Sequence, residues 1–179
     1  MEDRLPPGQV LTERFPVLHY GRVPEFDPET WCLMFWGEVE APLRLSWQDI
    51  QSLPKRQMLA DLHCVTRWSK LDTLWEGFGL DTLGEAGLLR LTGKARFLIQ
   101  HAAHGFTSNL PIEAVRAENF LFATGYEGNP LSPEHGAPLR GVCGAIPGRR
   151  DLQDLYLWKG AKWLIGLEFC EQDRPGFWE

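Results

Sequence analysis

The sequence predicts an α+β domain built on a mixed, coiled β-sheet with short helices and long loops. Segments rich in β-forming residues outnumber helical ones, the helical segments are short and scattered, and strand and helix do not alternate regularly. Apolar residues make up 44% of the chain and charged residues 23%, which is the usage of an ordinary globular protein. We therefore expect one domain with its own core over residues 1–179.

Strands are expected where β-forming residues gather between turn residues. These segments are 31–39, 43–45, 57–66, 95–102, 120–124, 139–146, 155–158 and 162–170. Residues 1–30 precede them and are rich in proline and charge, so we expect an extended arm there.

Short helices are expected between the strands. Ser46, with Asp49 three residues later, is typical of a helix N-cap and predicts a helix over 47–53. Apolar spacing predicts further helices over 72–78 and 82–89, and a helical turn is expected at 111–116.

Net charge, hydrophobicity and cysteine spacing argue against several classes of protein. A net charge of −6 argues against nucleic acid as the main partner. No apolar run approaches membrane-spanning length and the N-terminus has no secretory signal, so we expect no membrane partner and a cytoplasmic location. Four widely spaced cysteines without a CxxC pair fit reduced thiols. Eight tryptophans indicate an aromatic core or, less readily, a pocket floor.

The segment 61–69, with the sequence DLHCVTRWS, is the first candidate site. A thiolate is a strong ligand for soft metals, and His63 and Arg67 would give Cys64 the positive surroundings that keep it ionised. A buried structural cysteine at a strand end is the competing interpretation, because free cysteines are among the most buried residues.

A basic window marks the second candidate site. Residues 140–162 hold five basic and two acidic residues, net +3, whereas the rest of the chain holds 13 basic and 22 acidic residues, net −9. Such a window indicates a site for an anionic molecule, or else a solvated surface. Within it, the small residues Gly160 and Ala161 would let backbone N–H groups approach an anion, with Lys162 neutralising the charge.

Histidines supply the remaining candidates. His135 and Arg140 flank a turn held by a glycine and a proline, where a ring and a guanidinium can grip a heteroaromatic group and an anion. His101 and His104 lie three residues apart and leave open a zinc site together with Cys64.

Six segments, taken in order, resemble the molybdopterin-binding oxidoreductase domain of the sulfite oxidase-like family. They are PVLHYGRVP (16–24), DLHCVTRWS (61–69), GFTSNLP (105–111), GNPLSPEHGAPLR (128–140), YLWKGAKWLIGLEF (156–169) and PGFWE (175–179). The resemblance reaches nearly the full length of the chain and implies the fold of that domain over residues 1–179.

The resemblance also implies the site. Molybdopterin would hold molybdenum, with tungsten not excluded, and Cys64 would be the metal's protein ligand. Cys64 and Arg67 become the catalytic candidates, Arg67 because it would orient an oxo-bearing substrate. The implied cofactor-binding residues are His19, Tyr20, Cys64, His101 or a residue beside it, His135, Arg140, Gly160, Ala161 and Lys162.

The implied reaction is a two-electron oxygen-atom transfer on a small substrate, with an unidentified electron-transfer partner. Sulfite is not the expected substrate, because Thr124 stands near the position of the tyrosine of sulfite oxidases and their arginine run is reduced to Arg67. Two alternatives remain: a non-redox carrier of molybdopterin, and a small thiol or zinc protein.

Overall fold

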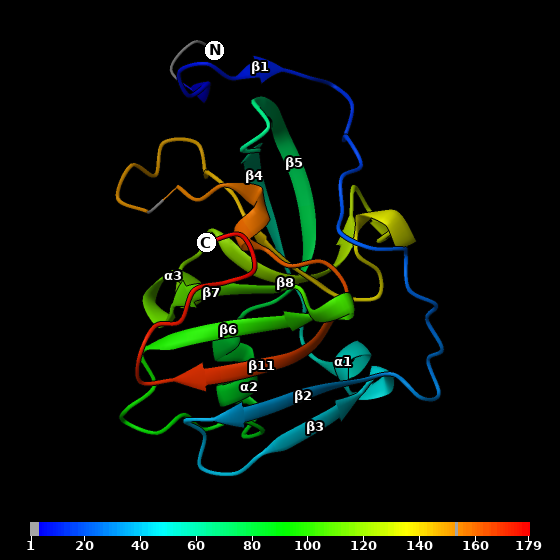
Figure 1. The fold of residues 1–179 in the computed structure, drawn as a ribbon, viewed down its shortest axis with the longest axis vertical. Coiled ribbons are helices and arrows are strands. Elements are labelled where there is room, and N and C mark those ends of the chain that lie inside the picture. The colour runs from blue at the N-terminus through cyan, green and yellow to red at the C-terminus, as the bar shows by residue number, and fades with distance from the viewer. Residues whose placement is uncertain (1–3, 153) are drawn as a thin grey trace.

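The computed structural model describes residues 4–152 and 154–179. These residues form two β-sheets joined by short helices and long loops, and both sheets contain parallel and antiparallel pairs. The structure thus confirms the expected α+β class, with the strands divided between two sheets (Figure 1).

Six strands of the described chain form the first sheet. They are β1 (Val10–Leu11), β4 (Arg56–His63), β5 (Trp68–Phe78), β8 (Phe120–Tyr126), β9 (Asn129–Pro130) and β10 (Arg140–Cys143). The long strand β5 pairs with β4, β8 and β1, and β8 pairs in turn with β10 and β9. Because β4 turns directly into β5, the connecting loop 64–67 lies at one end of this sheet.

The second sheet has the order β3-β2-β11-β6-β7 in the described chain. Its strands are β2 (Cys32–Gly37), β3 (Leu43–Ser46), β6 (Phe97–Ala102), β7 (Thr107–Pro111) and β11 (Leu164–Cys170). The late strand β11 lies between β2 and β6, parallel to the first and antiparallel to the second. The sheet therefore needs both ends of the chain.

Three short α-helices are present in the described residues: α1 (Trp47–Ser52), α2 (Leu80–Glu85) and α3 (Ile112–Arg116). The predicted cap of α1 is confirmed, since Ser46 Oγ accepts a hydrogen bond from Asp49 N at 3.2 Å. The Asp49 carboxylate in turn accepts one from Ser46 N at 2.8 Å. No helix of the described residues is long and apolar enough to span a membrane.

Two predicted elements are wrong. Residues 72–78 continue strand β5, because pairing with β4 and β8 overrides a local spacing that also suits a helix. Residues 155–158 do not form a strand; a 3₁₀ turn at Leu157–Lys159 takes their place, closed by a 3.0 Å hydrogen bond from Gly160 N to the Leu157 carbonyl.

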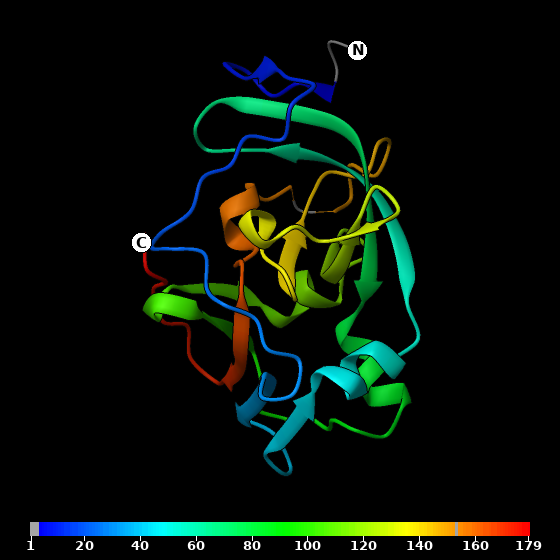
Figure 2. The same ribbon diagram turned by 90° about the vertical axis from the view of Figure 1, so that its right-hand side faces the viewer.

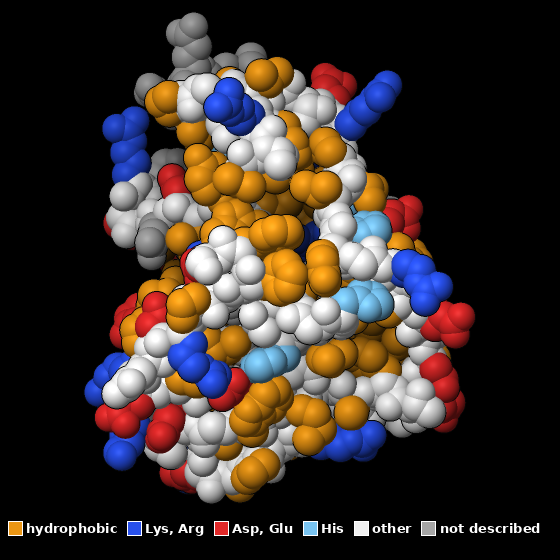
Figure 3. Space-filling model, viewed as in Figure 1, with side chains coloured by type: hydrophobic (Ala, Val, Ile, Leu, Met, Phe, Trp, Pro, Cys, Tyr) orange, Lys and Arg blue, Asp and Glu red, His pale blue; other side chains and the backbone are white. Residues whose placement is uncertain are grey.

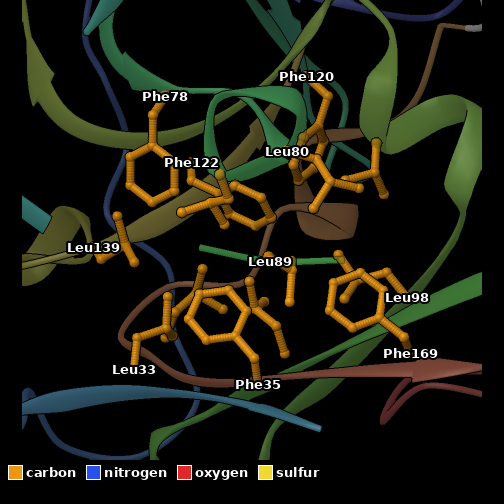
Figure 4. Close-up of a cluster of buried hydrophobic side chains, with 14 of the residues drawn as sticks. Leu33, Phe35, Phe78, Leu80, Leu89, Leu98, Phe120, Phe122, Leu139 and Phe169 are labelled. Atoms are coloured by element: carbon orange, nitrogen blue, oxygen red, sulfur yellow. The ribbon is translucent and has the colours of Figure 1, made fainter. Parts of the chain in front are cut away.

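The main core fills the space between the two sheets (Figure 4). Phe78 and Phe122 of the first sheet face Leu33, Phe35 and Phe169 of the second sheet, and all five side chains are fully or almost fully buried. This packing fixes one sheet against the other and sets the positions of the loops at their ends.

The N-terminal arm runs along the molecule from one sheet to the other (Figures 1 and 2). It begins as β1 beside β5, crosses the surface as an extended chain, and enters β2 in the second sheet. On the way, Lys162 Nζ donates a hydrogen bond to the Leu18 carbonyl at 3.0 Å. The arm thereby covers the region where several predicted site residues lie.

Candidate active site

A cavity of about 640 Å³ lies under the N-terminal arm. It is bounded by the arm, the loop after β4, the end of β6, the 3₁₀ turn before β11, and the C-terminal tail. Figure 3 shows hydrophobic side chains gathered around a hollow near the middle of this face. Six predicted site residues line the cavity: His19, Tyr20, Cys64, Arg140, Gly160 and Lys162.

Cys64 follows the last residue of β4 and begins the tight turn into β5. Its carbonyl accepts a 2.9 Å hydrogen bond from Arg67 N, and its own N–H donates to the Trp68 carbonyl at 2.9 Å. The sulfur lies 3.1 Å from Thr66 Oγ1, and the residue is only 7% exposed although it lines the cavity. The turn thus holds a buried thiol at the wall of the cavity.

His63 and Arg67, which were predicted to keep the Cys64 thiol ionised, do not line the cavity. Arg67 has an exposed side chain outside the cavity lining, and its backbone adopts a left-handed conformation with φ of 70°. His63 is buried on the opposite face of β4, where Nδ1 lies 2.8 Å from Ser69 Oγ, and burial lowers its pKa.

Arg140 brings a buried positive charge to the cavity. The residue is 1% exposed, and its guanidinium donates to the carbonyls of Gly141 at 3.1 Å, His135 at 2.9 Å and Gly160 at 3.5 Å. No carboxylate of the described residues pairs with it, and burial lowers its pKa to about 10. Because a buried charge is costly unless it is paired, this cation provides a site for an anion.

A second cation, Lys162, lines the same cavity. Its Nζ donates to the carbonyls of Leu18 at 3.0 Å and Glu134 at 2.7 Å. Burial, and then the positive charge of Arg140, lower its pKa to about 7. A lysine whose pKa is lowered by burial and by a neighbouring cation is typical of a site that binds a negatively charged group.

His135 packs beside the cavity. Its ring stacks on Phe15, a lining residue, with centroids 3.9 Å apart and planes 6° apart. Nδ1 is buried without a hydrogen-bond partner, and burial, followed by the charges of Lys162 and Arg140, lowers its pKa to about 4. The ring is therefore neutral at pH 7 and keeps an unused polar atom.

The arm residues His19 and Tyr20 form part of the rim. The His19 ring lies 5.0 Å from the Trp163 ring, and its Nδ1 lies 3.0 Å from the Gly21 carbonyl oxygen. Tyr20 is 46% exposed and its ring lies 4.6 Å from that of Phe177.

The predicted turn at Gly160–Lys162 presents two of its three residues to the cavity. Gly160 lies so close to β10 that a Cβ there would be 2.2 Å from the Gly141 carbonyl oxygen. Ala161 points away from the lining, and its N–H donates to Gln100 Oε1 at 3.3 Å. The close approach explains the glycine, and Ala161 holds the turn onto β6.

His101 does not line the cavity. On β6 its Nε2 lies 2.8 Å from Glu168 Oε2 on the neighbouring strand β11, and its ring lies 4.8 Å from that of Trp36. The next two residues, Ala102 and Ala103, do line the cavity. The proposed zinc partner of His101 is His104, whose Nε2 lies 2.6 Å from the Arg22 carbonyl oxygen. Among the described residues, no three His, Cys, Asp or Glu side chains come together as a metal site would require.

The aromatic wall of the cavity was missed from sequence. Four of the eight tryptophans line it, whereas the composition favoured a core role. They come from three separate parts of the chain and are Trp68, Trp158, Trp163 and Trp178. The only sequence signal was that three of them, Trp158, Trp163 and Trp178, lie in the basic window or between it and the C-terminal end.

Comparison with known proteins places the chain among oxidoreductases. Residues 20–178 match the family model described as "Oxidoreductase molybdopterin binding domain". The "Uncharacterized oxidoreductase YuiH" of Bacillus subtilis (strain 168) is 43% identical over 178 residues, which cover 98% of this chain and 84% of that protein.

A more distant relative and a solved structure with the same fold are both longer than this chain. The "Protein-methionine-sulfoxide reductase catalytic subunit MsrP" of Campylobacter jejuni is 28% identical over 169 residues, 86% of this chain and 54% of that protein. The crystal structure of the sulfane dehydrogenase SoxCD from Paracoccus pantotrophus shares the fold, with a TM-score of 0.72 and 20% identity over 91% of this chain and 43% of that one.

Proposed function

Since the chain belongs to the oxidoreductase molybdopterin-binding domain family, we propose that it is a molybdenum-cofactor-dependent enzyme that transfers an oxygen atom to or from a small substrate. The family and the fold are those predicted from sequence. The observation that carries the proposal is that the Cys64 thiol and the carboxylate-free cation of Arg140 line one cavity. Metal analysis decides between molybdenum and tungsten.

The side chains around the cavity suit molybdopterin, which combines a planar heteroaromatic ring, a phosphate and sulfur ligands for a metal. Arg140 and Lys162 supply positive charge for the phosphate, and the buried Nδ1 of His135 supplies a polar atom for the ring system. Cys64 supplies a soft ligand for the metal. When bound, the cofactor would supply two-electron redox chemistry.

Each remaining residue has a defined part in the proposal. His19 and Tyr20 would close the cavity from the arm, and Gly160 with Ala161 would keep backbone close to the anion. The part first given to His101 passes to its neighbours at the end of β6, which line the cavity. Arg67 stays a catalytic candidate only if its exposed side chain turns inward to orient the substrate.

The partners follow from the same proposal. A two-electron reaction needs a partner that accepts or supplies electrons, and we propose an unidentified one together with a small-molecule substrate. We also propose that the reaction takes place in the cytoplasm without a membrane or nucleic-acid partner, in agreement with the net charge of −6.

The test is expression in a host that makes molybdopterin, followed by metal analysis and pterin fluorescence after denaturation. We expect about one metal and one pterin per chain. Cys64→Ser should lose redox turnover with an artificial dye and most of the metal, whereas Cys170→Ser, a half-buried thiol outside the cavity, should keep both.

Three outcomes would contradict the proposal. Pure wild-type protein with neither metal nor pterin would exclude a molybdenum enzyme. Cys64→Ser protein that retains pterin and matches the wild type in every redox assay would favour the non-redox carrier instead. Zinc without molybdenum would favour the thiol or zinc protein.

A further inference from the structure

Apolar side chains make up much of the exposed part of the cavity lining, and His19 and Thr66 are its exposed polar members. Three residues of the lining combine an apolar side chain with high exposure: Leu18 at 63%, Val65 at 56% and Trp178 at 64%. An incoming molecule meets these side chains first, because more deeply buried lining residues lie behind them. Together with the exposed lining residues His19, Tyr20 and Thr66 they form the rim, and Figure 3 shows hydrophobic side chains around the hollow.

The positive charge of the cavity lies at its floor. Arg140 and Lys162 are the Arg or Lys side chains among the described lining residues, and no Asp or Glu accompanies them. Arg140 is 1% exposed, and Lys162 is held by two carbonyls beneath the arm. The proposed function assigns these cations to the cofactor's anionic group, so the rim lining is left without an Arg or Lys side chain for a substrate.

The rim is held in place by the C-terminal tail. Phe177 N donates to the Thr107 carbonyl at 3.0 Å, and Gly176 N donates to Glu179 Oε2 at 2.9 Å. Glu179 also forms an ion pair with Lys159, the residue before Gly160. Trp178 stands between these anchors, so its ring is a built wall of the entrance rather than a free end.

We infer that the substrate is an uncharged molecule carrying an aromatic or bulky aliphatic group, and not a small inorganic oxyanion. This rests on the proposed function. An anion would lose hydration against Leu18, Val65 and Trp178 without gaining a charged partner. A neutral apolar group would instead remove apolar surface from water and pack on the tryptophan ring. The rim therefore selects for a neutral substrate.

A matched pair of probes tests the inference. Methyl phenyl sulfone and benzenesulfonate both carry a phenyl ring on an SO₂ group, but only the second is charged. Titrated into the cofactor-loaded protein and followed by calorimetry, the sulfone should bind at least about tenfold more tightly, because only the sulfonate loses the hydration of a charge. Equal binding, tighter binding of the sulfonate, or no binding of either probe would overturn the inference.

A charge placed on the rim should change the preference. Val65→Lys is expected to weaken binding of the sulfone and to strengthen binding of the sulfonate by about fivefold or more. Leu59→Lys is the matched control, since Leu59 is also half-exposed on the neighbouring strand β4 but lies outside the cavity. An unchanged probe preference in Val65→Lys would contradict a role for the rim in substrate choice.

Failure of the proposed function and failure of the inference about the substrate can be told apart on one sample. Metal and pterin content, measured before the titration, report the proposed function. A sample without cofactor refutes that function, whereas a loaded sample that prefers the sulfonate refutes the inference alone.

Discussion

Gln9 of the N-terminal arm donates a hydrogen bond from its side-chain amide to the main-chain carbonyl of Cys64, at 3.1 Å. The oxygen of the same side-chain amide, Gln9 Oε1, accepts a hydrogen bond from Ser69 Oγ at 3.2 Å. Since Ser69 donates there, its oxygen is free to accept from His63 Nδ1 at 2.8 Å, which assigns the ring hydrogen to Nδ1. One arm residue thus connects both sides of the Cys64 turn.

Gln9→Ala should loosen this turn. We expect a loss of about 1 kcal/mol in the free energy of unfolding, because two hydrogen bonds to the turn disappear. The measurements are urea denaturation and the alkylation rate of Cys64 in cofactor-free protein, which should rise. Thr12→Ala is the control, since among the described residues the Thr12 side chain bonds only to the main chain of Arg14 within the arm. Equal alkylation rates in both variants would contradict the prediction.

Arg140→Met should abolish retention of the cofactor. The substitution keeps an apolar side chain of similar length but removes the buried cation that has no carboxylate partner. Pterin per chain, measured by fluorescence after denaturation, is expected to fall at least about tenfold, since charge-assisted bonds to phosphate are lost. Arg96→Met removes an exposed guanidinium that bonds to the Gly93 and Ala95 carbonyls, and should retain pterin. Similar pterin content in the two variants would count against the anion site.

Stability should fall in mild acid partly because of His135. Its pKa is about 4 in the folded protein against an ordinary value of 6.5, so the unfolded chain binds more protons between these values. The free energy of unfolding therefore decreases as the pH falls from about 6.5 to about 4. His135→Phe keeps a ring to stack on Phe15 and should reduce this decrease. Part of the decrease in stability should remain in this variant, because the pKa of the buried His63 is also lowered.

The measurement is urea denaturation of cofactor-free protein at several pH values across that window. From neutral pH toward acid, the free energy of unfolding should fall less in His135→Phe than in the wild type. Each protein is compared with its own value at neutral pH. Parallel curves for the two proteins would show that His135 does not titrate in the folded state as described.

Gly160→Ala should destabilise the turn that holds Lys162. A Cβ at this position would lie 2.2 Å from the Gly141 carbonyl oxygen, so the turn or β10 must move. We expect a loss of about 1–3 kcal/mol in the free energy of unfolding, the usual cost of forcing extra atoms into a packed region. Gly93→Ala is the control, because nothing lies within 4 Å of a Cβ there. A stability loss of the same size in both variants would contradict the packing argument.

Local sequence signals predicted part of this structure well. The cap at Ser46 depends only on residues within one turn, and it formed as expected. Cys64, Arg140 and Lys162 were singled out by chemistry and charge, and the fold brings all three to one cavity. Their distance in sequence did not matter because each carried its own signal.

Other features depend on contacts that no local pattern contains. The spacing over 72–78 suits a helix, but hydrogen bonding to two neighbouring strands makes it part of β5. Strand alternation turns His101 toward Glu168 and leaves its neighbours Ala102 and Ala103 on the cavity. The aromatic wall is assembled from β5, the 3₁₀ turn with the residues that follow it, and the tail, so only the folded chain reveals it.

The arm that covers the cavity is translated long before two of the residues that hold it, His135 and Lys162. The hydrogen bond between Leu18 and Lys162 joins residues 144 positions apart, and Phe15 meets a ring at His135. A nascent chain can therefore pair the arm with β5 before Lys162, which holds the middle of the arm, has been made. Closing so long a loop has an entropic cost that only the arm's own contacts offset. The middle of the arm should accordingly be the last part of the structure to form its contacts during biosynthesis and the first to lose them in the folded protein.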